Sequence, residues 1–187
     1  MSARIAMCEL EHPKEAAIIK NYVQHFPELY REQQGLVLYG QNGTGKSYLA
    51  AALCNALIDG GHEAYFTTFS RIEKEAGAKT REERKEYLDS LNGFSLLVLD
   101  DLGAERGSDY MQELVFNVVD ARYGSGKPMI VTTNLTMNDL KTPHTAQQSR
   151  IYDRILQICY PVPVTGDSLR RRDTKERYYH TKEILEG

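Results

Sequence analysis

The chain has 187 residues, enough for one domain with a hydrophobic core and too few for two of ordinary size. Its residues are 41% hydrophobic and 26% charged, and the net charge of −3 excludes an overall positive field that would draw it to nucleic acid or a membrane. The three cysteines lie far apart and no apolar run could span a bilayer, which argues against a disulfide framework, a zinc site or a membrane partner and favours the cytoplasm.

The N-terminal part of the chain predicts a helix, a strand and a second helix. Residues 14–26 carry apolar side chains at helical spacing and predict an amphipathic lead-in helix. The apolar run at 36–39 predicts a short buried strand that ends in a glycine-rich loop. Residues 46–58 predict the next helix, and Gly60 and Gly61 end it.

The middle of the chain begins with a strand pattern at residues 63–69. Ser70 and Thr80 are each followed three residues later by a glutamate, which is the spacing of a capping box. We therefore expect two charged helices, beginning after Ser70 and after Thr80.

The C-terminal half continues the alternation. Strands are predicted at 94–99, 128–133 and 159–164, and a helix is predicted at 145–158. Another helix should begin at Ser108, a good N-cap residue. Strands that are apolar throughout and alternate with helices indicate an α/β fold, with a parallel sheet covered on both faces.

The glycine-rich loop carries the clearest motif of the chain. Residues 40–47, GQNGTGKS, match the phosphate-binding pattern GxxxxGK[ST] between a predicted strand and a predicted helix. Lys46 would supply a cation to the β- and γ-phosphates, and the Ser47 hydroxyl would ligate Mg²⁺. The sequence thus predicts a site for ATP and Mg²⁺, and its nucleotide-binding residues are Gly40, Gln41, Asn42, Gly43, Thr44, Gly45, Lys46, Ser47 and Tyr48.

Two acidic residues and an asparagine follow the next apolar strands. Asp100 and Asp101 come directly after 94–99, and Asn134 comes after 128–133. An open parallel sheet binds its ligands at the carboxyl ends of its strands. We expect Asp100 to hold Mg²⁺, Asp101 to orient the attacking water, and Asn134 to reach the γ-phosphate or that water.

A resemblance to a known family rests on five segments in a fixed order. The segments GQNGTGKS, LLVLDDLGAE, IVTTN, SRIYDRI and VTGDSLR resemble those of an AAA+ ATPase of the DnaC/IstB-like family, over about residues 20–172. That family contains bacterial replicative helicase loaders and transposition helper ATPases. The resemblance implies a P-loop NTPase AAA+ core with a five-stranded parallel sheet in the order 5-1-4-3-2 and no helical lid domain. We place the lead-in at residues 1–35 and the ATPase domain at 36–187.

The resemblance also assigns roles to single residues. It gives Asn134 the sensor-1 position and makes Arg154 an arginine finger for the ATP of a neighbouring copy, in a homo-oligomer; Arg150 is the less favoured candidate. Arg170 would be the sensor-2 arginine, which contacts phosphate in its own subunit. Asp101 stands where the wider AAA+ group has glutamate, which implies slow, switch-like hydrolysis.

The function implied by the resemblance is that of a helicase loader domain in DNA replication. Its expected partners are a replicative helicase and single-stranded DNA. The basic candidates for the DNA contact are Lys74, Lys79, Arg81 and Arg84, with Arg171, Arg172 and Lys175 in the tail, although the acidic neighbours of the first four make a solvated charged face the favoured interpretation there. Only 39 residues precede the phosphate loop, so we expect a fragment or a minimal relative whose helicase-binding region is missing.

Three alternatives stay open. A transposition helper ATPase of the same family would bind duplex DNA and a transposase. A P-loop small-molecule kinase would need an acceptor pocket and arginines from its own chain. A nucleotide-binding scaffold without useful hydrolysis is the third, because Asp101 is one methylene shorter than glutamate.

Overall fold

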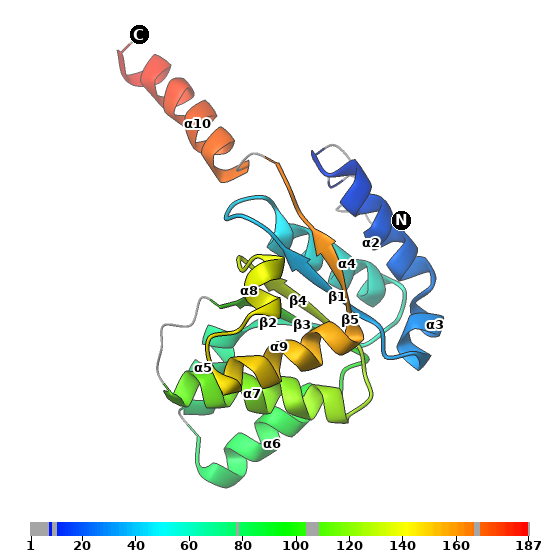
Figure 1. Ribbon diagram of the computed structural model, residues 1–187. Helices are drawn as coiled ribbons and strands as arrows, with labels where there is room; N and C mark the ends of the chain where they lie inside the picture. The colour runs from blue at the N-terminus through cyan, green and yellow to red at the C-terminus, as the bar shows by residue number, and fades with distance from the viewer. Residues whose placement is uncertain (1–7, 9–10, 78, 104–108, 167–168, 187) are drawn as a thin grey trace.

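A five-stranded parallel sheet forms the centre of the computed structural model, which describes residues 8, 11–77, 79–103, 109–166 and 169–186, with residues 109 and 169–177 described as backbone only (Figure 1). The strand order is β2-β3-β4-β1-β5, the predicted order read from the opposite edge. The strands are β1 (Gly35–Tyr39), β2 (Ala64–Thr68), β3 (Leu96–Leu102), β4 (Met129–Thr133) and β5 (Cys159–Pro163). The fold class predicted from the sequence is confirmed.

Helices cover both faces of this sheet, as Figure 1 shows. On one face α2 (Pro13–Gln24) and α4 (Lys46–Asp59) pack over alternate residues of β1, including Leu36 and Leu38. On the other face α5 (Phe69–Gly77), α7 (Asp109–Gly124) and α9 (Ala146–Ile158) pack over the residues between them, such as Val37. Side chains on a strand alternate between the two faces, so an uninterrupted apolar run supplies both layers of core at once.

The remaining helices lie at the edges of this core. They are α3 (Phe26–Arg31), α6 (Arg81–Leu91), α8 (Met137–Lys141) and α10 (Leu169–Glu186). The residues of α10 were expected only to form a polar tail, and in Figure 1 this helix projects from the body of the molecule. Among the described residues, no helix combines the length and the apolar character needed to cross a bilayer.

The two predicted capping boxes have different outcomes. At Thr80 the hydroxyl accepts from Glu83 N and the Glu83 carboxylate accepts from Thr80 N, so this prediction is confirmed. The box at Ser70 is wrong, because α5 already begins at Phe69 and the Thr68 hydroxyl accepts from Arg71 N at 3.1 Å. The cap predicted at Ser108 lies outside the described residues.

Strand β5 forms one edge of the sheet and contains two prolines. It pairs only with β1, with Pro161 opposite Val37 and Pro163 opposite Tyr39. Just beyond it, Val164 N donates to Tyr39 O at 2.8 Å and continues the ladder to the start of the phosphate loop. The edge strand therefore supports the backbone from which that loop departs.

Candidate nucleotide site and a second, arginine-bearing face

The glycine-rich loop joins the end of β1 to the start of α4 at the carboxyl edge of the sheet. Gly40 has a φ of +148°, and a Cβ at this position would lie 2.2 Å from Val164 O, so no larger residue fits. Gly45 is the N-cap of α4 with a φ of +92°, a left-handed conformation that strains most other residues. The loop thus turns its backbone N–H groups and the positive end of α4 toward the same space.

Lys46 is the cation of this loop and is almost completely buried, with 6% of its surface exposed. Its ammonium donates to Gly40 O at 2.8 Å and to Gln41 O at 2.7 Å. The Thr44 hydroxyl also donates to Gln41 O, at 2.9 Å. These bonds hold the lysine head against the loop, within reach of any phosphate that the loop encloses.

The facing wall is built from the ends of β3 and β4, where the ladder is irregular. The pairing of the two strands shifts between Leu99 and Leu102, so Asp100 and Asp101 lie in a bulge. Asp101 has a φ of +67°, one of two positive values recorded for residues other than glycine in the described chain. Bulges change the direction in which side chains point, and they occur often beside active sites. Both acids belong to β3 itself, whereas the sequence placed them after its end.

Hydrogen bonds tie the two acids to β4. The Thr132 hydroxyl donates to Asp100 Oδ1 at 2.6 Å and accepts from Asp101 N at 2.9 Å. The Asn134 amide donates to Asp101 Oδ1 at 3.1 Å. Thr132 was not among the predicted site residues. Its only signal was a hydroxyl at the end of an apolar strand, and its role depends on the register between β3 and β4.

Both walls enclose a cleft of about 530 Å³. The cleft is lined by residues of the loop, of α4 and of the two strand ends: Asn42, Gly43, Gly45, Lys46, Ser47, Tyr48, Asp100, Asp101, Thr132 and Asn134. The Ser47 hydroxyl and the Asp100 carboxylate, the two predicted metal ligands, therefore share one cavity, and oxygen donors of this kind suit Mg²⁺. Most of the nucleotide-site residues predicted from the sequence come together here.

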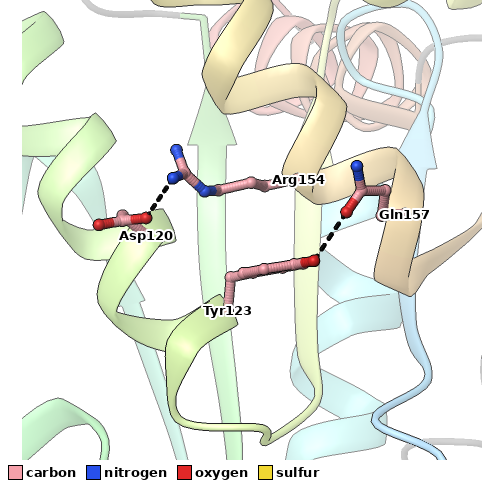
Figure 2. A network of polar contacts seen from close by, with 4 residues as sticks. All are labelled: Asp120, Tyr123, Arg154 and Gln157. Carbon is pink, nitrogen blue, oxygen red and sulfur yellow. Dashed lines mark hydrogen bonds and ion pairs between the residues drawn. The ribbon is translucent and has the colours of Figure 1, made fainter.

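Arg154 lies on a separate face, between α7 and α9. Its Nη2 is 2.5 Å from Asp120 Oδ1, and its guanidinium carbon is 4.8 Å from the ring centre of Phe116 (Figure 2). A shallow hollow of about 400 Å³ is lined there by Arg154, Arg150 and four neighbours. The lining of the nucleotide cleft includes neither arginine, so the arginine-finger role expected from the sequence stays a prediction.

The remaining basic residues predicted to contact phosphate or DNA differ in their surroundings. The backbone of Arg170 lies in α10, but its side chain is outside the described part of the structure. Arg84 donates from Nε to Ala76 O at 3.1 Å and stacks on Tyr110, and Lys79 lies over the ring of Tyr87. These two DNA candidates are thus held by contacts within the protein, while Lys74 and Arg81 are exposed.

Comparisons with known proteins agree with this geometry. The model of a family described as IstB-like ATP binding protein matches residues 18–177. The replicative helicase loader DnaC of Escherichia coli is 29% identical over 159 residues, which are 83% of this chain and 64% of that protein. A putative insertion sequence ATP-binding protein of Sinorhizobium fredii is also 29% identical, over 78% of this chain and 49% of its own length.

Solved structures give the same result for the fold. A crystal structure of the DnaC helicase loader has a TM-score of 0.66 at 25% identity and covers 83% of this chain and 90% of the solved chain. This chain spans less than two thirds of the length of either curated relative. What those whole proteins do therefore extends to this chain only as a proposal.

Proposed function

This chain belongs to the family of IstB-like ATP-binding proteins, and from that premise we propose that it is the ATPase domain of a replicative helicase loader. It binds Mg·ATP in the cleft between the phosphate loop and the ends of β3 and β4. It hydrolyses ATP slowly, in assemblies in which each copy completes its neighbour's site. The observation that carries the proposal is the bonded set of Asp100, Asp101, Thr132 and Asn134 facing Lys46 across one cleft.

Within that cleft the loop binds the phosphates, and the facing wall helps to bind the metal ion and orients the attacking water. Backbone N–H groups of the loop and the Lys46 ammonium neutralise the phosphate oxygens. Ser47 and Asp100 would hold Mg²⁺, which when bound neutralises charge on the β- and γ-phosphates. Thr132 donates to Asp100 Oδ1 and so leaves the other carboxylate oxygen for the metal or its water ligands.

Asp101 is the group that orients and deprotonates the attacking water. Its bond from Asn134 uses Oδ1 and leaves Oδ2 to accept from water. The positive φ and the bulge turn this short side chain toward the cleft, which in part offsets the missing methylene. Its reach is still less than that of glutamate, so turnover should be slow.

Partners follow from the relatives and are part of the proposal. Similarity to the replicative helicase loader DnaC favours a replicative helicase as the protein partner. Single-stranded DNA is proposed as the nucleic acid on the family resemblance of the sequence motifs. Lys74 and Arg81 are exposed on α5 and α6 and are the better candidates for DNA contact. The Sinorhizobium fredii relative supports a second candidate, a transposition helper, whose DNA would be double-stranded.

The proposal is tested by ATP turnover with single-stranded DNA, with duplex DNA of the same sequence, and with neither. Turnover that changes at least severalfold with single-stranded DNA alone supports the helicase loader. A response confined to duplex DNA would favour the transposition helper. Turnover that needs a small phosphate acceptor would exclude both and would identify a kinase.

A further inference from the structure

We propose that Asp120 is the positioning residue for Arg154. Its carboxylate holds one edge of the guanidinium, so that the opposite edge is presented to the phosphates bound by a neighbouring copy of this chain. The inference rests on the proposed function, because it requires Arg154 to act on a neighbour's ATP. Asp120 itself would not touch the nucleotide and would act only through the arginine.

The contacts of Arg154 come from one face of α7. Phe116, Asp120 and Tyr123 follow each other at spacings of four and three residues, which aligns them along that face. The guanidinium carbon lies 4.8 Å from the Phe116 ring centre and 5.9 Å from that of Tyr123, and Nη2 is 2.5 Å from Asp120 Oδ1. The rings restrict the plane of the guanidinium, and the carboxylate restricts its rotation within that plane.

The face that carries these contacts is firmly joined to α9. The Tyr123 hydroxyl donates to Gln157 Oε1 at 2.8 Å, so a hydrogen bond links the helices three residues beyond Arg154 (Figure 2). Beneath it, Val119 and Ile155 are fully buried in the same core. Functional side chains act best when rigid elements and neighbouring bonds fix them. Arg154 has such support from both helices.

The free edge of the guanidinium suits a phosphate. Figure 2 shows Nη2 turned toward Asp120 and the other terminal nitrogen turned away from it. An arginine has five N–H donors in a fixed plane, so a bond to one carboxylate oxygen leaves paired donors for phosphate oxygens. Arg154 is 27% exposed and Asp120 is 45% exposed, so the pair adds little to the stability of the fold. In this proposal the pair serves to orient the Arg154 guanidinium.

The test is ATP turnover by Asp120→Asn, which keeps the shape of the side chain and removes its charge. At saturating ATP we expect the rate to fall about 10-fold while ATP affinity stays unchanged, because a displaced catalytic group lowers rate without weakening substrate binding. Asp120→Glu should restore part of the rate. Asp59→Asn makes the same chemical change at an exposed position at the end of α4, outside the lining of the hollow that holds Arg154, and should behave as wild type.

Mixed assemblies distinguish two explanations for a slow Asp120→Asn protein. Either Arg154 is misplaced at the neighbour's ATP, or the nucleotide cleft of the mutated subunit itself is damaged. Lys46→Ala subunits should bind ATP poorly but carry an intact Arg154–Asp120 pair, so adding them to Asp120→Asn protein should raise its turnover. Arg154→Ala is measured alongside, and light scattering verifies that each mixture assembles.

Wild-type or faster turnover in Asp120→Asn, while Arg154→Ala is impaired, would overturn this inference and leave the proposed function intact. Failure of assembled mixtures to recover would also overturn it. Wild-type turnover in Arg154→Ala would instead refute the trans role on which both depend.

Discussion

The Lys46 side chain is the single group on which nucleotide binding depends most directly, because its ammonium is the cation held at the centre of the phosphate loop. We expect Lys46→Ala to weaken ATP affinity about 100-fold or more, since charge-assisted bonds to phosphate are among the strongest hydrogen bonds in proteins. Titration with a fluorescent ATP analogue measures the loss. Lys14→Ala removes an exposed lysine and should leave affinity unchanged. Wild-type affinity in Lys46→Ala would refute the site.

Asp101 makes a separable prediction, because its proposed role concerns water and not phosphate. Asp101→Asn should bind ATP as well as wild type, and its turnover should fall about 100-fold or more, in line with loss of a general base. Single-turnover hydrolysis measured with saturating protein isolates the chemical step. Asp59→Asn, which changes an exposed aspartate at the end of α4, is the matched control. If Asp101→Asn retains full turnover, another group activates the water.

At the scale of secondary-structure elements, Arg122 connects the end of α7 to the starts of two strands. Its guanidinium is fully buried and donates to Phe94 O, Ser95 O and Pro128 O at 2.7 to 3.1 Å. Burial lowers the pKa of Arg122 to about 10, so the group stays protonated at neutral pH. One side chain therefore satisfies three backbone carbonyls just before β3 and β4.

Arg122→Ala should lower the free energy of unfolding by about 3 kcal/mol, because it leaves buried carbonyls without donors. Arg122→Lys should be intermediate, since one ammonium cannot reproduce the planar fork. Urea denaturation followed by circular dichroism measures both. Arg150→Ala removes an exposed arginine and should change stability by no more than about 0.5 kcal/mol. A loss for Arg122→Ala no larger than that of Arg150→Ala would show that water replaces these bonds.

The strands could be predicted from the sequence because their signal is local. The central strands β1, β3 and β4 contain apolar runs whose residues are buried, as expected in a parallel sheet that is covered on both faces. Contacts between elements left no such signal. Thr132 bonds to Asp100 only because β3 and β4 pair in one register, and Asp120 meets Arg154 only because α7 lies beside α9. The wrong capping box at Ser70 has a local cause. The hydroxyl of Thr68, two residues earlier, accepts from Arg71 N in its place.

At the scale of the whole molecule, Arg154 lines a different hollow from the nucleotide cleft, so its proposed role requires a second copy to complete the site. Arg154→Ala protein should bind ATP normally and hydrolyse it poorly at any concentration, since arginine fingers contribute about 10³–10⁵ in rate in the strongest cases. Mixing it with Lys46→Ala protein should restore some turnover, because one mixed interface then has both an intact cleft and an intact arginine. Absence of recovery in mixtures shown to assemble would mean that Arg154 acts elsewhere.

The two prolines of β5 have a consequence for how copies can associate. Val164 N points inward to β1, and N–H groups alternate along a strand, so Pro161 and Pro163 occupy positions whose N–H groups would point outward. Proline has no N–H, so this outer edge lacks the donors with which a further strand would pair. Fibrous, edge-to-edge growth of the sheet is thereby blocked on this side. In the proposed assembly around ATP, a neighbouring copy on this side would therefore meet the molecule through side chains, helices and loops and not through a continued sheet.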